Sequence, residues 1–334
     1  MRLATYNVEW FANLFDDDDQ LVRDDSWSSR RDVTKAQQAD AVAAVFKAID
    51  ADAVLVVEAP DQHSKRSAVA ALENFASAYG LRTSEAIIGF SNDTQQEIAL
   101  LYDPNVVTAR HAPVGTIEAP RFDQEFHIDL DVDERQDTVQ FSKPPLELLM
   151  QTANGNEFRL IGAHLKSKAP HGARNDREVM KISIANRRKQ LAQAIWLRRR
   201  IVHHLQAGES LIVAGDLNDG PGLDEYEDLF GRSSVEIVMG EQGQDCLHDP
   251  HARLALGRKL NARPTTSRFF IKKENRYLQA LLDYVMVSAD LRAKAPKWRI
   301  WHPFDDYECF RDTELRDALL TASDHFPVTL NIDL

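Results

Sequence analysis

The sequence contains only two cysteines, Cys246 and Cys309, among its 334 residues. Two cysteines exclude a disulfide framework of several bridges, and these two do not have the spacing of a zinc site. No apolar run approaches the roughly 18–20 residues that cross a bilayer, and no charged and then apolar leader opens the chain. We therefore expect a globular, cytoplasmic protein with no membrane span.

The sequence also has no internal repeat and no linker rich in proline, glycine or serine. Its hydrophobic content of 43% is enough for one large domain or two medium ones. Because two separate domains would need a linker, we predict that residues 1–334 form a single domain. Segments 110–145 and 230–265 are polar, and we expect them to be irregular insertions.

The net charge of −12 argues against a protein that coats nucleic acid without specificity. The charge is unevenly distributed, because residues 161–200 contain eleven Lys and Arg against two acids. This segment, which includes Lys166, Lys168 and Arg174, is a candidate docking site for a polyanion. The alternative is that its charges only solvate the outer face of a helix.

Apolar segments of strand length alternate with segments of helical periodicity, which predicts an α/β protein. Helices are expected from the N-terminal cap Thr34 to Ile49, over about 65–79, and over about 177–205 with Arg and Lys facing outward. Several strands are apolar on both faces, so we predict two sheets sandwiched between layers of helices. The predicted strands are 3–8, 53–57, 83–88, 98–102, 158–163, 211–214, 282–287 and 328–332.

Polar side chains end the first two predicted strands, where Asn7 and Glu9 follow one apolar run and Glu58 follows another. A carboxylate at such a position is costly to bury unless it is paired or bound to a cation. Oxygen ligands of this kind favour Mg²⁺ or Mn²⁺ over zinc. The local sequence leaves open the alternative that Glu58 is simply exposed to solvent at a strand end.

Two further strand ends carry groups suited to phosphate chemistry. Asp216 and Asn218 follow an apolar strand, and since side chains two residues apart point the same way in an extended chain, both can reach one site. The alternative is an Asx turn, because this stretch is rich in turn-forming residues. His164 ends another strand and is followed by Lys166 and Lys168, so an imidazole that can donate a proton would lie beside cations that neutralise phosphate.

The hexapeptide SDHFPV at residues 323–328 opens the last predicted strand with an acid and a histidine side by side. Asp324 and His325 could together hold a cation and position a water. Asp283 lies within an otherwise apolar strand and, if buried, needs a partner. His325 is the natural one, because a carboxylate fixes the tautomer of an imidazole and raises its basicity.

Six short motifs together resemble those of the endonuclease/exonuclease/phosphatase superfamily. They follow the order of that superfamily along nearly the whole chain: TYNVEW (5–10), VE (57–58), GAHLKS (162–167), GDLN (215–218), LDYV (282–285) and SDHFPV (323–328). The resemblance implies a four-layer α/β sandwich, in which two packed mixed β-sheets are flanked by helices and the site lies at one end of the sheets. Segments 110–145 and 230–265 match only loosely.

The resemblance also implies a metal cofactor. Mg²⁺ or Mn²⁺ would be bound through Glu58, with Asn7 and Glu9 nearby, and Asp324 would complete the network of metal and water. The superfamily usually has Asp where this chain has Glu9, which is a departure from its pattern.

For catalysis, the resemblance implies that Asp216 and Asn218 align the attacking water and the scissile phosphate. His325, backed by Asp283, would act as base or as phosphate clamp. Abasic-site endonucleases carry Tyr in the region of His164, so this chain is more similar to the deoxyribonuclease, sphingomyelinase and bacterial nuclease branches.

The segment FSKPPL at 141–146 looks most like the bacterial nucleases. Those enzymes often have Arg where this chain has Lys143, so the resemblance implies that Lys143 contacts phosphate.

We therefore predict a divalent-metal-dependent phosphodiester hydrolase, specifically a nuclease that acts on DNA or RNA by in-line attack of a metal-organised water. Protonated His164 and Asn218 would stabilise the phosphoryl oxygens. One alternative is that the same site acts on a small-molecule or lipid phosphate ester. Another is an inactive relative that serves as a binding module. The sequence leaves open the oligomeric state and the choice between DNA and RNA.

Overall fold

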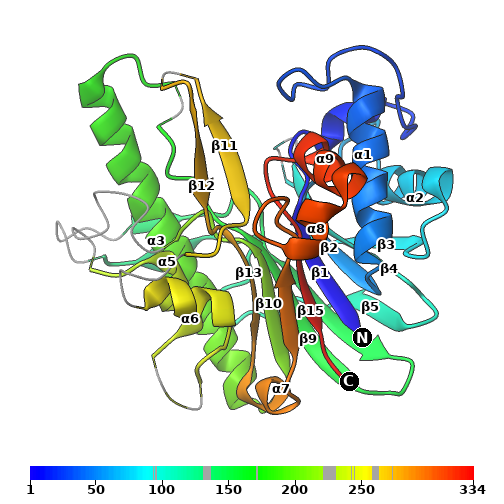
Figure 1. Ribbon diagram of the computed structural model, residues 1–334. Coiled ribbons are helices and arrows are strands. Elements are labelled where there is room, and N and C mark those ends of the chain that lie inside the picture. Colours follow the sequence, from blue (N-terminus) through cyan, green and yellow to red (C-terminus); the bar gives the residue numbers. More distant parts are fainter. Residues whose placement is uncertain are drawn as a thin grey trace.

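The structure is a computed structural model that describes residues 1–92, 94, 96–130, 137–170, 172–220, 231–241, 243, 245–257, 263–272 and 274–334. Two β-sheets lie face to face at its centre (Figure 1). The larger sheet has the strand order β14 (Lys297–Ile300), β15 (Val328–Asn331), β1 (Arg2–Asn7), β2 (Ala53–Ala59), β4 (Glu97–Tyr102) and β3 (Glu85–Ile88). The second has the order β13 (Asp283–Val287), β10 (Leu211–Asp216), β9 (Glu157–His164), β8 (Leu146–Thr152) and β5 (Val107–His111).

Both sheets are mixed. In the larger sheet β1 runs parallel to β2, and in the second β9 runs parallel to β10, whereas the neighbouring pairs are antiparallel. Two small two-stranded sheets stand beside them: β6 (Phe126–Ile128) with β7 (Asp137–Val139), and β11 (Ser267–Ile271) with β12 (Arg276–Ala280).

Helices cover the outer faces of both sheets (Figure 1). The larger sheet carries η1 (Phe11–Leu14), α1 (Lys35–Ile49), α2 (Ala68–Tyr79), α8 (Tyr307–Arg311) and α9 (Thr313–Ala322). The second sheet carries α3 (Asp176–Gln206), α5 (Ser234–Met239) and α6 (Pro250–Leu256). The short α7 (Ala289–Ala293) joins β13 to β14.

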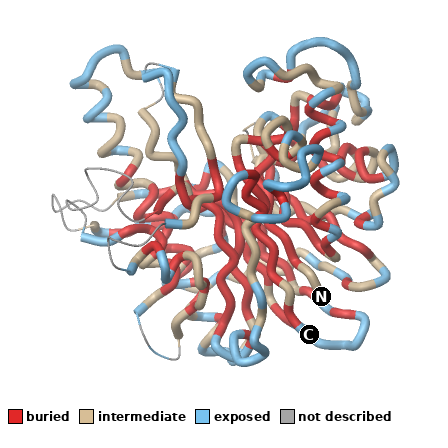
Figure 2. The backbone as a smooth tube through the Cα atoms, in the orientation of Figure 1, coloured by how far each residue is buried: buried red, intermediate tan, exposed pale blue. Residues whose placement is uncertain are grey.

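Three apolar clusters hold these layers together. One lies between the two sheets, where Leu55 of β2 and Leu160 of β9 belong to the same cluster, and the other two lie beneath the helix layers. Figure 2 shows the result as continuous burial along the central strands, with exposed chain mainly in the loops and outer helices. The predicted four-layer α/β sandwich is therefore confirmed.

The predicted elements are present with small changes at their ends. The first predicted helix begins at Thr34, whose hydroxyl accepts the N–H of Gln37 while the Gln37 side chain accepts the N–H of Thr34. The second ends at Gly80, which adopts the left-handed conformation (φ 63°) that stops a helix. The sequence analysis did not predict three strands of the two large sheets, which are β5, β8 and β14.

The prediction of irregular segments at 110–145 and 230–265 is wrong where short strands and helices form, and it is confirmed over stretches such as 112–125, which contain neither helix nor strand. The first contains β6 and β7 and buries Phe122, Phe126 and Phe141 against Trp196 of α3. The second contains α5 and α6, which pack on the same core. Parts of both segments (131–136, 230, 242, 244 and 258–262) lie outside the described residues. That these segments are insertions, and that residues 1–334 form one domain, stays a prediction.

The prediction that the Arg and Lys side chains of the third helix face outward is wrong at two positions. Arg187 and Arg200 are almost fully buried. Arg187 donates to Asp219 Oδ2 across 2.6 Å, and the Nε of Arg200 lies 3.2 Å from Glu147 Oε1. Buried carboxylates therefore neutralise part of the cationic segment, which periodicity alone does not reveal.

Glycine allows the strands of the second sheet to pass close to their neighbours near the site. A Cβ on Gly162 would lie 2.5 Å from Leu55 in the facing sheet, and a Cβ on Gly215 would lie 2.0 Å from the carbonyl oxygen of Ala163. Gly215 also has φ +126°, which side-chain-bearing residues rarely adopt. These glycines directly precede the strand ends that carry His164 and Asp216.

Within the described part of the chain, no helix combines the length and the apolar character needed to cross a membrane.

Candidate active site

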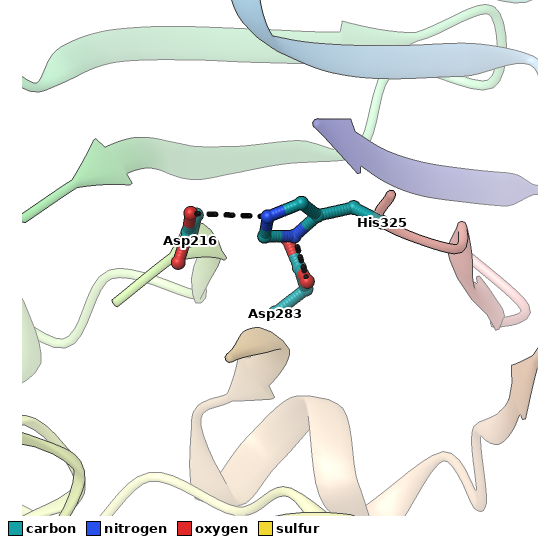
Figure 3. A group of neighbouring side chains, drawn as sticks. All are labelled: Asp216, Asp283 and His325. Carbon is teal, nitrogen blue, oxygen red and sulfur yellow. Dashed lines mark hydrogen bonds and ion pairs between the residues drawn. The ribbon is translucent and has the colours of Figure 1, made fainter. Parts of the chain in front are cut away.

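Four strand ends and one loop bring polar side chains together at one end of the two sheets. Asp216 is paired in register with His164 on one side and with Asp283 on the other. Asn7 at the end of β1 reaches the same place, because its Nδ2 donates to Asp216 Oδ2 across 3.1 Å. His325, in the loop before β15, completes the group (Figure 3). These residues, up to 318 positions apart in the chain, form one buried cluster.

The His325 ring is fixed by Asp283. Nδ1 lies 2.8 Å from Asp283 Oδ2, and Nε2 lies 4.0 Å from Asp216 Oδ2 (Figure 3). Burial by itself lowers the pKa of His325, but the carboxylates of Asp283, Asp216 and Asp324 raise it well above its usual value. The predicted Asp283–His325 pair is therefore present, and its electrostatic surroundings favour an imidazolium with Nε2–H turned toward Asp216.

The carboxylate of Asp216 lies at the centre of the cluster. Its Oδ1 accepts the backbone N–H of Asn218 across 2.7 Å, and its Oδ2 accepts Asn7 Nδ2. Burial and the neighbouring Asp283 raise the pKa of Asp216 to about 7, with His325 opposing this shift. Such a carboxyl group can take up a proton near neutral pH, which an exposed Asp cannot.

Asn218 is both a turn residue and a neighbour of the site. It has the left-handed backbone (φ 49°) that Asn tolerates better than most residues, and its Nδ2 donates to the carbonyl oxygen of Leu165 across 3.1 Å. The Asx turn that the sequence offered as an alternative is therefore present and holds Asp216, while a role of Asn218 in the site stays a prediction.

His164 is buried at the end of β9. Its Nδ1 lies 3.3 Å from Lys143 Nζ, and its Nε2 lies 3.8 Å from Asp216 Oδ2. Burial, followed by the Lys143 ammonium, lowers the pKa of His164 well below its usual value. This direction favours a neutral ring over the protonated His164 expected from the sequence, and because the Lys143 ammonium can only donate, Nδ1 would accept and the proton would lie on Nε2.

A second carboxylate group adjoins this cluster at the end of β2. Glu58 follows Val57, which is paired in register with Asn7, and its backbone is left-handed (φ 59°) at a bulge in the pairing of β2 with β4. Burial raises the pKa of Glu58, while Lys143 and His325 act in the opposite direction. Glu58 is thus not a solvent-exposed strand end, and its carboxylate forms no ion pair with another described residue.

Asp324 belongs to the same acidic group. Burial raises the pKa of Asp324, and Glu58 acts in the same direction, whereas His325 and Arg30 lower it. Acids gathered in this way repel one another and are stabilised by a cation.

Glu9 has different partners. One carboxylate oxygen accepts Trp10 Nε1–H across 2.9 Å, and the other pairs with the guanidinium of Arg30. Burial and the nearby Asp324 raise the pKa of Glu9. Both of its oxygens are therefore engaged by the protein itself.

The donor set fits a hard divalent cation. The amide oxygen Oδ1 of Asn7 is buried and accepts no hydrogen bond from the described residues, although its Nδ2 is engaged. Mg²⁺ or Mn²⁺ satisfies a buried oxygen of this kind, and the acid Glu58 directly follows Val57, the residue that pairs with Asn7. Asp216, Asp283 and His325 offer a second set of ligand atoms that lie within 4.8 Å of one another.

The four residues that were predicted to bind the substrate have different surroundings in the structure. Lys143 lies inside the site beside His164; burial lowers the pKa of both side chains, and the nearby Lys166 acts in the same direction. Lys168 instead forms a 2.7 Å ion pair with Asp219, so its first role is to hold the loop after β9. Arg174 is exposed in the segment before α3, and no described contact joins its side chain to the cluster.

Sequence reasoning missed residues that orient the predicted ones. Thr266 donates its hydroxyl to Asp283 Oδ2 across 2.8 Å, and Ser323 donates its own to the carbonyl oxygen of Asn7 across 2.7 Å. Arg30 crosses from the loop after η1 to Glu9. Ser323 could have been found from its place in the SDH motif, whereas Thr266 and Arg30 lie in segments that carry no motif.

Comparisons with known proteins agree with this arrangement. A sequence profile of the Endonuclease/Exonuclease/phosphatase family matches residues 4–325. An endonuclease/exonuclease/phosphatase from Bacteroides vulgatus is similar at 14% identity and a TM-score of 0.50, over 100% of this chain and 98% of that one. No curated protein sequence gives a significant match.

Two structures of NExo are also similar over 100% of both chains, each with a TM-score of 0.50. One is the 3'-5' exonuclease from Neisseria meningitidis, at 13% identity, and the other is the 3' phosphatase from Neisseria bound to a product DNA hairpin, at 14% identity. At such low identity the likeness shows the fold.

Proposed function

The chain belongs to the Endonuclease/Exonuclease/phosphatase family, whose members hydrolyse phosphoester bonds, and we propose that it is a divalent-metal-dependent nuclease acting on DNA or RNA. The observation that best supports this proposal is the Asp283–His325 pair, because Nε2 of His325 faces the buried carboxylate of Asp216, whose pKa is raised. A polar constellation buried at the mouth of two apolar sheets is costly unless it binds or transforms a charged substrate.

Asn7 and Glu58 would hold the Mg²⁺ or Mn²⁺ ion, with Asp324 close by. Bound there, the ion would polarise a phosphoryl oxygen and neutralise charge as it develops. In this proposal Glu9 does not bind the ion, because Trp10 and Arg30 occupy its two carboxylate oxygens; it orients these two side chains instead.

Asp216 is the residue that we propose to orient the attacking water and accept its proton. Its raised pKa suits it to proton transfer near neutrality. Asn7 and the backbone N–H of Asn218 fix the carboxylate, so that little reorganisation is needed when the proton moves.

His325 and His164 would bind the phosphate on either side of Asp216. The imidazolium of His325 would donate Nε2–H to a non-bridging oxygen, and the neutral ring of His164 would donate its own Nε2–H. Lys143, 3.3 Å behind His164, fixes that tautomer and adds a positive charge. In this proposal the donors would stabilise the charge that accumulates on the phosphoryl oxygens in an in-line displacement.

We propose nucleic acid rather than a small phosphate ester as the substrate because positively charged side chains are exposed around the start of α3. Arg174, Arg177 and Lys181 are exposed at the start of α3, which projects past the ends of the sheets beside the β11–β12 hairpin (Figure 1). The observation that favours a small or lipid substrate is that Arg187 and Arg200 are buried, so the basic surface is smaller than the sequence indicates. A cytoplasmic location stays a prediction from the sequence.

The proposal is tested by a substrate screen on the purified protein with Mg²⁺ or Mn²⁺. Single- and double-stranded DNA, RNA, an abasic duplex, sphingomyelin and inositol phosphates are compared at equal phosphate concentration, with His325→Ala as the control for contaminating nuclease. Hydrolysis of a nucleic acid that depends on His325 supports the proposal. Hydrolysis of the lipid or inositol esters alone would replace it by the small-substrate alternative.

A further inference from the structure

Trp10 and Phe11 are adjacent in the chain but have opposite environments. Phe11 is fully buried, with edge contacts to the rings of Phe15 and Phe75. Trp10 is 44% exposed. A tryptophan gains more from burial than almost any other side chain, so its position at the surface next to a buried phenylalanine points to a role outside the core.

The backbone turns sharply to place Trp10 outside. Its φ of 59° and ψ of 26° lie in the left-handed region, which is a genuine outlier for a bulky residue. Residues held in this way cluster at functional sites, because the surrounding structure must compensate for the strain. Glu58, the proposed metal ligand, has the same left-handed φ of 59°.

The indole is held rigidly. Its Nε1–H donates to Glu9 across 2.9 Å, Glu9 pairs with Arg30, and Arg30 also donates to the carbonyl oxygen of Leu320 across 3.0 Å. This chain of contacts ties the ring to α9. An aromatic ring fixed before the ligand arrives loses little entropy when it stacks.

The exposed part of Trp10 lines a hollow of about 200 Å³ whose other residues include Glu58, Asn13 and Gln96. A second hollow of about 440 Å³ shares Asn13 with the first and is lined further out by Trp27, which is 67% exposed. Trp10 therefore lines the same hollow as Glu58, whose carboxylate would hold the ion, and this hollow adjoins a second one through Asn13.

From this placement we infer that Trp10 is a stacking platform for an unpaired nucleobase of the nucleoside next to the phosphate under attack. Every base has a π-face, and aromatic side chains bind bases by stacking once these are free of a duplex. The inference rests on the proposed function and specifies it: the substrate is a phosphodiester with an accessible base, as in a single strand or a small dinucleotide.

Binding and hydrolysis are compared for Trp10→Ala, Trp10→Phe and the control Tyr307→Ala, an aromatic that is 70% exposed and lines neither hollow. Dissociation constants are measured in a His325→Ala background for a single-stranded oligonucleotide, its fully abasic counterpart and a dinucleoside monophosphate. Trp10→Ala should weaken binding of the base-containing ligand roughly 5- to 150-fold, the range that stacking of one base gives. It should change binding of the abasic strand less than about twofold, and Trp10→Phe should restore most of the affinity.

The ligand whose binding is weakened by Trp10→Ala, either the oligonucleotide or the dinucleoside monophosphate, identifies the class of ligand that the protein binds. Quenching of tryptophan fluorescence by that ligand should disappear in Trp10→Phe. Equal weakening for base-containing and abasic ligands would overturn the inference, because Trp10 would then only support Glu9. If the wild type and the Trp10 variants bind and hydrolyse base-containing phosphodiesters equally well, only the inference about Trp10 fails. If the wild type hydrolyses only esters that contain no base, both the inference and the proposed nuclease function fail.

Discussion

The ring of His325 meets Asp283 across 2.8 Å, Nδ1 to Oδ2, and this contact joins the loop before β15 of one sheet to β13 of the other. Thr266 donates to the same Oδ2 atom across 2.8 Å. The orientation of His325 therefore depends on the correct packing of both sheets.

Asp283 and His325 should act as one unit. Asp283→Asn and His325→Ala should each lower kcat by roughly 10²–10⁴, and the double variant should be hardly worse than either, because residues that function together lose their effect together. Thr266→Val should cause a smaller decrease in the same direction. Steady-state kinetics on the wild type, the two single variants and the double variant measures the coupling, and strictly multiplicative decreases would show that Asp283 and His325 act independently.

Metal dependence should follow the carboxylate of Glu58. EDTA should abolish hydrolysis, and Mg²⁺ or Mn²⁺ should restore it, because the oxygen donors here match hard cations. Mn²⁺ should also raise the Tm of the wild type through binding to the folded state alone, and Glu58→Gln should remove that shift. Glu157→Gln, at the exposed start of β9, is the matched control. Full activity in chelator would contradict the prediction.

His164 should act on the phosphate rather than on the leaving group. Since burial and Lys143 lower its pKa, the ring has no second proton to give at neutral pH. His164→Ala should therefore lower kcat by about 10²–10³, the typical effect of removing one such donor, equally for alkyl and p-nitrophenyl esters. A defect that vanishes with the p-nitrophenolate leaving group would instead identify a general acid.

The buried Asp219 should make stability depend on pH at the acid end. Burial by itself raises the pKa of Asp219, but Lys168 and Arg187 lower it below its usual value. The folded state therefore holds this proton more weakly than the unfolded chain does. The stabilisation should be complete above the unfolded pKa of about 3.9 and should be lost as the pH falls through the lower, folded pKa.

Asp219→Asn tests this by denaturant unfolding at several pH values. The substitution should cost about 3–5 kcal/mol near pH 7, because it removes the buried carboxylate that pairs with Arg187 and Lys168. The difference from wild type should shrink below about pH 4. Asp40→Asn breaks an exposed pair with Arg23 and should cost only about 0–1 kcal/mol. A difference that does not change with pH would contradict the prediction.

The basic surface at the start of α3 should bind the backbone of the substrate. Reversal of Arg174, Arg177 and Lys181 to Glu should flatten the dependence of log K on log salt by up to about 0.7 for each phosphate of a single strand that the variant no longer binds. The same charge change at Arg292, Lys294 and Lys297, near the end of the sheets marked by the chain termini, is the control (Figure 1). An unchanged slope in the first variant would favour the small-substrate alternative.

The fold class and the positions of the main strands could be predicted from the amino-acid sequence, since apolar runs and capping residues such as Thr34 act over a few residues. The polar residues at the strand ends could be identified in the same way. A carboxylate such as Asp216 or Glu58 after an apolar run is costly to bury unless it is paired or bound to a cation, so its position indicates a site. These features are local, and local patterns are what a single sequence records.

Which of these groups touch, and in which protonation state, depends on the tertiary structure. Burial and then Lys143, which is 21 residues away, lower the pKa of His164, and burial together with Asp283 in the neighbouring strand raises the pKa of Asp216. Arg187 looks like a surface charge in the sequence, yet Asp219 makes it a buried one. Long-range packing sets the dielectric environment and the partners of each charge, and these cannot be obtained from spacing along the chain.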